Sequence, residues 1–168
     1  MPTTTTRAEE HQARWEEITS DPSLRNLPYK VETNQRGQIV LSPHENRHSF
    51  LQERVQDLLD EYAPEGRHPP EFAIATPEGV KAPDVVWMSP ERLREMEKTG
   101  DPTMLAPEIC VEVLSSSNTE QEINEKRALY REVGADEVWV VDEDNQIRFY
   151  RDEEMDHSRI APDCPPEL

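Results

Sequence analysis

The 168-residue sequence predicts an α/β fold with a mixed β-sheet flanked by helices. Short apolar runs rich in β-branched residues alternate with segments of helical periodicity, in the order helix, three strands, helix, strand, strand. Some of these runs carry apolar residues on both faces, which is typical of strands covered on both sides. Helices packed on both faces of one sheet satisfy this pattern, and the length suffices for one domain with a real core.

The chain divides into three predicted parts. Residues 1–27 are polar, and a helical pattern around Trp15 and Ile18 predicts a loosely attached N-terminal extension. Residues 28–151 hold the alternating pattern and form the expected domain. Residues 152–168 are acidic and contain prolines, so we expect an extended or disordered tail.

The domain starts with a hairpin predicted over residues 29–41, where two β-prone runs flank residues 34–37. A helix should follow, because Ser42 and Glu45 have the spacing of a capping box and Pro43 suits the first helical position. The buried stripe of this helix is expected to comprise Leu51, Val55, Leu58, Leu59 and Tyr62.

The later elements follow the same logic of apolar runs bounded by turn residues. Strands are predicted over residues 71–76, 80–88 and 108–114, with a short helix capped by Ser89 before the last of them. A longer helix is predicted over residues 119–133, ending at Gly134, and a final hairpin over 136–142 and 147–151.

Three charged residues occupy positions that the pattern assigns to the core. Glu112 lies in the apolar run 108–114, and Asp84 opens the buried half of the preceding strand. Lys126 lies on the apolar stripe of the helix that follows. Because burying a charge without a partner is costly, we expect the helix to fold back over the sheet and to aim Lys126 at Glu112.

Two carboxylates on adjacent strands can share a hard divalent cation, Mg²⁺ or Mn²⁺, which prefers oxygen ligands. Such an ion acidifies a water and polarises a phosphodiester, and a nearby lysine can orient the attacking water. Structural alternatives stay open. Glu112 and Lys126 could form a plain buried salt bridge, Asp84 could cap a turn, and Lys126 could pair with Glu122.

Four stretches carry a resemblance to a known family. They read "GQIVLSPHENRHSFLQERVQDLL", "GVKAPDVVWMSPERL", "APEICVEVLSSSNTEQEINEKRALYREVGADEVWVVD" and "IRFY", and they lie between residues 29 and 151. Together they resemble the Uma-type restriction endonuclease family, within the PD-(D/E)xK nuclease superfamily. The resemblance implies a restriction-endonuclease-like core and an endonuclease that uses Mg²⁺ to hydrolyse phosphodiester bonds of DNA, its substrate.

The resemblance also implies roles for individual residues. Asp84 matches the aspartate of the PD element and Glu112 the acidic residue of the (D/E)xK element. Leu114 stands where the lysine of that element would be, and Lys126 on the following helix takes its place. The implied catalytic set is therefore Asp84, Glu112 and Lys126, and we expect the Val113 carbonyl to complete the metal ligands.

The first helix of the superfamily often supplies a further acidic or polar group. The candidates here are Glu45, His48 and Gln52, while Glu71 is a further candidate metal ligand beside Asp84. A packed, hydrogen-bonded histidine is the alternative for His48. His44 and His48 have the i, i+4 spacing of a zinc-binding pair, but the sequence offers no third ligand.

The overall charge bears on the function. The net charge is −18 at pH 7, so the surface repels polyanions at long range, and non-specific binding to nucleic acid is not expected from charge alone. This balance favours an alternative class, a non-catalytic binding or assembly module with an acidic surface on the same fold. A nuclease that acts on RNA or on single-stranded ends is a third class.

Other features concern location and assembly. The two cysteines, Cys110 and Cys164, lack zinc-binding spacing, and Cys110 is expected in the core. Neither a signal-peptide pattern nor an apolar run of membrane-spanning length is present, which favours the cytoplasm. We expect a homodimer; the runs 138–142 and 147–150 could supply an apolar face for it, but the sequence leaves the pairing surface open.

Overall fold

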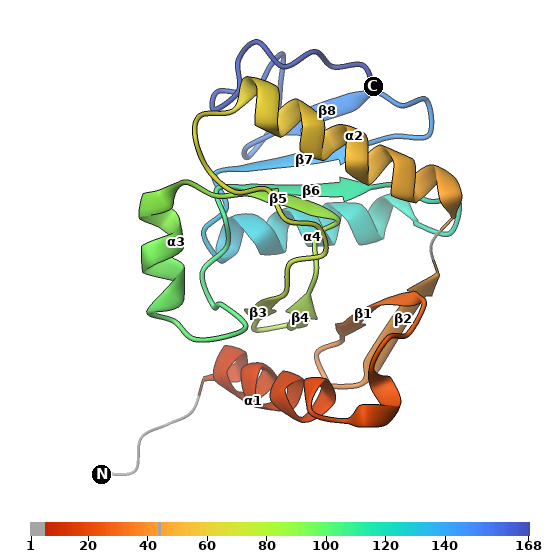
Figure 1. Ribbon diagram of the computed structural model, residues 1–168, viewed down its shortest axis with the longest axis vertical. Helices are drawn as coiled ribbons and strands as arrows, with labels where there is room; N and C mark the ends of the chain where they lie inside the picture. The colour runs from red at the N-terminus through yellow and green to blue at the C-terminus, as the bar shows by residue number, and fades with distance from the viewer. Residues whose placement is uncertain (1–5, 44) are drawn as a thin grey trace.

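The computed structural model describes residues 6–43 and 45–168. At its centre lies a five-stranded sheet in the order β5-β6-β7-β8-β9 (Figure 1). The strands are β5 (Val85–Trp87), β6 (Ile109–Val113), β7 (Glu137–Val141), β8 (Ile147–Tyr150) and β9 (Glu154–Met155). β6 and β7 are parallel, and the other neighbouring pairs are antiparallel. The predicted α/β class with a mixed sheet is confirmed.

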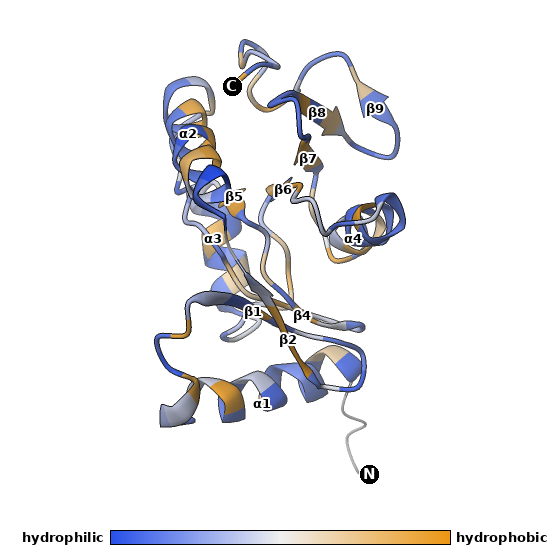
Figure 2. Cartoon of the chain, turned by 90° about the vertical axis from the view of Figure 1, so that its right-hand side faces the viewer, coloured by the Kyte–Doolittle hydropathy of each residue, from blue (hydrophilic) through white to orange (hydrophobic). Residues whose placement is uncertain are grey.

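Two helices cover opposite faces of this sheet (Figure 2). α4 (Glu120–Glu132) packs Tyr130 against one face, which includes Cys110, and the predicted burial of Cys110 is confirmed. α2 (Asn46–Tyr62) covers the other face with the buried side chains Leu51, Val55, Leu58 and Leu59 and the half-buried Tyr62. β6, between β5 and β7, is buried along its whole length, as expected of a central strand.

A second group of elements lies beside the sheet, at the bottom of Figure 1. Its members are α1 (Arg7–Thr19), the short 3-10 helix η1 (Pro22–Leu24) and four strands, β1 (Tyr29–Thr33), β2 (Ile39–Pro43), β3 (Ile74–Thr76) and β4 (Gly79–Lys81). β1 and β2 form the predicted hairpin, and β3 pairs with β4 in another.

α3 (Pro90–Glu97) follows β5 and has the predicted cap, Ser89. In the described ranges, none of the helices is long and apolar enough to cross a membrane.

α1 is firmly packed, so the predicted loose attachment was wrong. The helix lies against β3 and β4. His11 and Ile18 are buried, and the Gln12 side-chain amide donates to the carbonyls of Thr99 at 3.0 Å and Pro102 at 2.7 Å. The apolar pattern of this helix is weak, and polar side chains contribute much of its attachment.

The predicted capping box does not form. β2 extends through Pro43, and Ser42 pairs with Lys30 of β1. α2 begins only at Asn46, with Glu45 as its N-cap residue and no side-chain capping hydrogen bond. The backbone pairing of the hairpin therefore takes precedence over the local capping signal.

The run 80–88 was predicted as one strand but forms two. β4 ends at Lys81 and β5 begins at Val85. Pro83 lies in the break, and its nitrogen has no hydrogen to donate to a strand ladder. As a result β3 and β4 form a hairpin apart from the main sheet, and Asp84 stands immediately before β5.

The C-terminal segment 152–168 folds back onto the sheet, so the prediction of an extended or disordered tail was wrong. Cys164 joins the core next to α2. Glu137, at the start of β7, is fully buried and accepts hydrogen bonds from the Ser158 hydroxyl at 2.7 Å and the Ile160 N–H at 2.9 Å. This carboxylate needs donors because it is removed from water, and the tail supplies them.

Replacing Ser158 by alanine should destabilise the protein by about 1–3 kcal/mol, because the buried Glu137 carboxylate loses a donor. Urea unfolding followed by circular dichroism measures the difference. Ser49→Ala, at an exposed position of α2, is the matched control and should stay close to wild type. Equal stability of the two variants would contradict an anchoring role for Ser158.

Candidate functional site

Asp84 and Glu112 face each other across two neighbouring strands. Val85 pairs with Val111, so the same register carried one residue further sets Asp84 opposite Glu112. Residues opposite each other on paired strands project to the same side of the sheet. The Asp84 carboxylate also accepts a hydrogen bond from the Val113 N–H at 2.7 Å. Both carboxylates are almost completely buried, on the face that α4 covers.

The ammonium group of Lys30 lies between these two acids. Lys30 Nζ is 3.0 Å from Asp84 Oδ1 and 3.5 Å from Glu112 Oε2. Lys30 comes from β1, in the hairpin beside the sheet, and its side chain is only 7% exposed. The two carboxylates therefore share one cation, and it is provided by the chain itself.

Lys126 reaches the same group from α4. Its ammonium lies 3.5 Å from Glu112 Oε1, but its shorter contacts, 3.0 and 3.1 Å, are with the Glu32 carboxylate. Glu32 also accepts a hydrogen bond from the Ala82 N–H at 2.7 Å. The predicted approach of Lys126 to Glu112 is observed, with Glu32 as an additional partner.

Further hydrogen bonds fix the two acids. The Tyr130 hydroxyl donates to Glu112 Oε1 at 2.5 Å. On the α2 side, His48 Nε2 lies 3.0 Å from Asp84 Oδ1, and the Gln52 amide donates to the Asp84 carbonyl at 3.1 Å. Of the candidates predicted on this helix, His48 and Gln52 therefore lie beside Asp84.

Other predicted site residues lie outside this cluster. Glu45 is exposed and accepts a hydrogen bond of 3.4 Å from Ser116. Glu71 has an exposed side chain, although its backbone N–H donates to the Asp84 carbonyl at 3.0 Å. His44, the proposed zinc partner of His48, falls outside the described residues.

The environment shifts the pKa values of the two acids in opposite directions. Burial alone would raise the pKa of Asp84, but the Lys30 ammonium and the hydrogen bond with His48 hold it well below its ordinary value. Burial raises the pKa of Glu112, because the ammonium groups of Lys126 and Lys30 offset the desolvation only in part. The Asp84 carboxylate is therefore firmly ionised, whereas Glu112 accepts a proton more readily.

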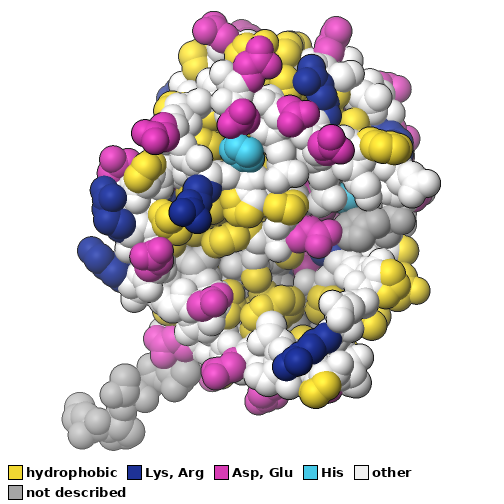
Figure 3. Space-filling model, in the orientation of Figure 1, with side chains coloured by type: hydrophobic (Ala, Val, Ile, Leu, Met, Phe, Trp, Pro, Cys, Tyr) yellow, Lys and Arg dark blue, Asp and Glu magenta, His cyan; other side chains and the backbone are white. Residues whose placement is uncertain are grey.

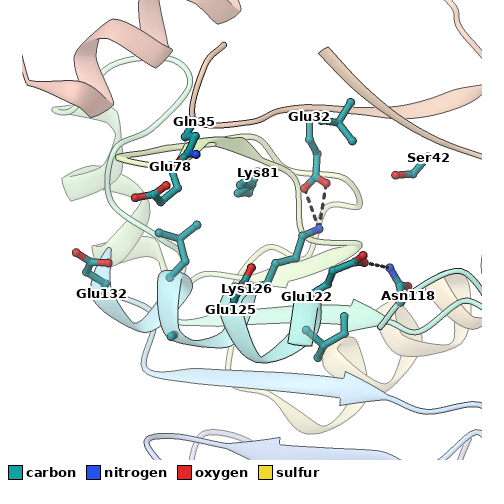
Figure 4. Close-up of a pocket in the computed structure, with 14 residues that line it drawn as sticks. Glu32, Gln35, Ser42, Glu78, Lys81, Asn118, Glu122, Glu125, Lys126 and Glu132 are labelled. Atoms are coloured by element: carbon teal, nitrogen blue, oxygen red, sulfur yellow. Dashed lines mark hydrogen bonds and ion pairs between the residues drawn. The ribbon is translucent and has the colours of Figure 1, made fainter. Parts of the chain in front are cut away.

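A pocket of ≈ 790 Å³ gives access to one end of the cluster. It lies between the β1–β2 hairpin, β4 and α4, and Figure 4 shows Lys126 reaching Glu32 beside it. Lys81 also lines it, and so do four further acids, Glu78, Glu122, Glu125 and Glu132. Lys126 is 22% exposed and Asp84 only 1%, so a molecule in the pocket would meet Lys126 first.

Comparison with known proteins identifies the family. Residues 12–164 match the family Uma2, described as "Putative restriction endonuclease". The chain belongs to the Uma2 family. A crystal structure from Anabaena variabilis, described as "a putative nuclease belonging to DUF820", has a similar fold, with a TM-score of 0.60, 18% identity and 74% of each chain covered. Among curated proteins there was no match. The family predicted from the sequence is therefore confirmed.

The acids of this Uma2 protein fit a divalent ion that is held by few protein ligands. Restriction-endonuclease-like families generally use divalent metals. Within residues 6–43 and 45–168, no three His, Cys, Asp or Glu side chains are grouped so that they could hold a metal. Mg²⁺, however, is commonly bound by one or two carboxylates together with waters and substrate phosphates. Asp84 and Glu112, whose oxygens already converge on one cation, form such a pair.

Lys30 and Glu32 were missed by the sequence interpretation. They are two residues apart on β1, so they project to the same face of the strand. Both are buried. Their spacing was a usable signal, but in a short hairpin alternating charged residues usually mark a face exposed to solvent. Only the position of the hairpin against the sheet distinguishes the two cases.

The Asp84→Asn variant of this Uma2 protein should be about 3–5 kcal/mol less stable than the wild type at neutral pH, because Lys30 loses the ionised partner that lies 3.0 Å away. The pKa of Asp84 is lower in the native state than its unfolded value of about 3.9. Ionised Asp84 therefore stabilises the native state above about pH 4, and this stabilisation is lost as the pH falls. The gap between wild type and variant should therefore narrow below about pH 4. Urea unfolding at several pH values tests this.

The matched control is Asp57→Asn, at an exposed position of α2. A constant gap between wild type and Asp84→Asn over the acid range would show that Asp84 is not held ionised in the native state.

Proposed function

We propose that the protein is an endonuclease that hydrolyses DNA phosphodiester bonds with Mg²⁺ or Mn²⁺. One observation carries the proposal. Asp84 and Glu112, on neighbouring strands, converge on a single cation position, and Lys126 contacts the second acid from the side of the pocket. Membership of the Uma2 family supports a nuclease, while the substrate, the ion and the residue roles belong to the proposal.

Asp84 and Glu112 would hold the metal, with the Val113 carbonyl as a further ligand. A bound divalent ion supplies a more acidic water and neutralises charge on the phosphate. The Val113 N–H and His48 hold the Asp84 carboxylate in place. Lys126, which is partly exposed to the pocket, would orient the attacking water and stabilise the charge that develops on the phosphate.

The surface limits how DNA approaches. On the face in Figure 3, acidic side chains are widely spread, and Lys and Arg side chains do not form one continuous patch. With a net charge of −18, the protein gains no long-range attraction for a polyanion. Binding would therefore rely on contacts at the site, where Lys126 and Lys81 line the pocket together with acids.

Lys126→Met should lower the rate of DNA cleavage about 100-fold or more in the presence of Mg²⁺ or Mn²⁺, because a group that stabilises developing charge is lost. Cleavage of a supercoiled plasmid measures the rate. Lys98→Met, at an exposed position after α3, is the matched control and should cut like wild type. Equal cutting by wild type and Lys126→Met would reject the assigned role.

The acidic surface favours a second candidate, a non-catalytic binding or assembly module on the same fold. This candidate predicts that neither DNA nor RNA is cut under any metal condition. If the protein cuts only RNA or only single-stranded ends, the proposed hydrolysis stands and the proposed substrate, duplex DNA, is wrong.

A homodimer stays a prediction, and the runs 138–142 and 147–150 expose less apolar surface than their sequence suggests. Trp139 of β7 and Phe149 of β8 are buried, and their rings meet edge to face with centroids 4.9 Å apart inside the core. α2 and the C-terminal segment belong to the same core, so these strands offer no open apolar face.

A further inference from the structure

We propose that Lys30 occupies the position of the catalytic metal and competes directly with it. A divalent ion can bind the Asp84–Glu112 pair only when the Lys30 ammonium leaves. This inference rests on the proposed function, because it concerns how the same site takes up its ion.

The geometry makes the two cations mutually exclusive. Lys30 Nζ lies 3.0 Å from Asp84 Oδ1 and 3.5 Å from Glu112 Oε2, so it stands where the two carboxylates converge. Mg²⁺ binds carboxylate oxygens at about 2.1 Å and carries its own shell of waters. An ammonium group and a hydrated ion therefore cannot both lie between these oxygens.

The second lysine does not have this role. Lys126 Nζ is bound to Glu32 at 3.0 and 3.1 Å and lies 3.5 Å from Glu112. No contact between Lys126 and Asp84 is observed among the ion pairs of the described residues. Lys126 stands beside the cation position, whereas Lys30 fills it.

There is a physical reason for Lys30 to lie between the two acids. Asp84 and Glu112 are 1% and 5% exposed, and two buried carboxylates without a cation would destabilise the fold. Lys30 supplies the compensating charge within the chain, so the protein does not need metal to fold. The same contact lowers its apparent metal affinity, because only the fraction of molecules with Lys30 displaced can bind.

The location of Lys30 allows it to leave. β1 pairs with β2 in a two-stranded sheet separate from the five-stranded one. Displacing the side chain therefore breaks no hydrogen bond of the strands that carry the acids. Glu32, on the same face of β1, also contributes to the electrostatic stabilisation of the Lys30 ammonium.

Calorimetric titration of the full chain with Mn²⁺ alone, without nucleic acid, tests the proposal. Lys30→Met should bind Mn²⁺ about tenfold or more tightly than wild type, since the competitor is gone. Lys126→Met is the matched control, because it removes one positive charge from the same cluster but leaves the shared position filled. Its gain should be clearly smaller.

Equal or weaker binding by Lys30→Met would overturn the proposal, and so would an equal gain in both variants, which would point to net charge alone. Absence of Mn²⁺ binding by both wild type and Lys30→Met would overturn it as well. Mn²⁺ binding is measured without any cleavage. If the proposed nuclease function is wrong, the plasmid assay therefore shows it separately.

A second measurement on the wild type covers the case in which Lys30→Met fails to fold. The chain has four lysines, Lys30, Lys81, Lys98 and Lys126. Reductive methylation followed by peptide mass spectrometry reports the accessibility of each, with the exposed Lys98 as internal reference. Mn²⁺ should increase labelling of Lys30 relative to Lys98. Unchanged labelling of Lys30 at Mn²⁺ concentrations that saturate binding would overturn the proposal.

Discussion

The buried charges around Asp84 and Glu112 link three parts of the molecule, namely the β1–β2 hairpin, the central sheet and α4. The acids come from the central sheet, whereas their cations come from a separate hairpin and from the helix on one face. Removing one partner would leave another charge buried and unpaired, which costs several kcal/mol. The interaction that makes the candidate site therefore also helps to hold the hairpin, the sheet and α4 together, so substitutions in the site should change stability as well.

Much of this arrangement follows from local patterns. Strand alternation and an apolar run place Glu112 in a central strand, and helical periodicity places Lys126 on the inner side of α4. Asp84 follows from the buried strand that it precedes. Because these inferences depend mostly on residues close together in the sequence, the sequence is sufficient to predict the class of fold and the approach of Lys126 to Glu112.

The remaining features depend on tertiary contacts that no local pattern encodes. Lys30 and Glu32 become site residues only because their hairpin lies against the sheet, and the same alternation would suit a solvated strand equally well. The tail was misjudged for a related reason. Its apolar content is low, and its attachment combines a few core contacts, such as that of Cys164, with hydrogen bonds to the distant, buried Glu137. The break at Pro83 was visible in the sequence, but the apolar residues on either side concealed it.

The wide spacing of the site along the chain has a consequence for biosynthesis. Ribosomes release a protein from its N-terminus, so Lys30 emerges long before Glu112, and Lys126 emerges last. Contacts between residues so far apart form late, since they require most of the chain to be ordered. A nascent or truncated chain that ends before Lys126 therefore lacks at least one member of the cluster. The complete cluster of charges therefore exists only once synthesis has passed α4.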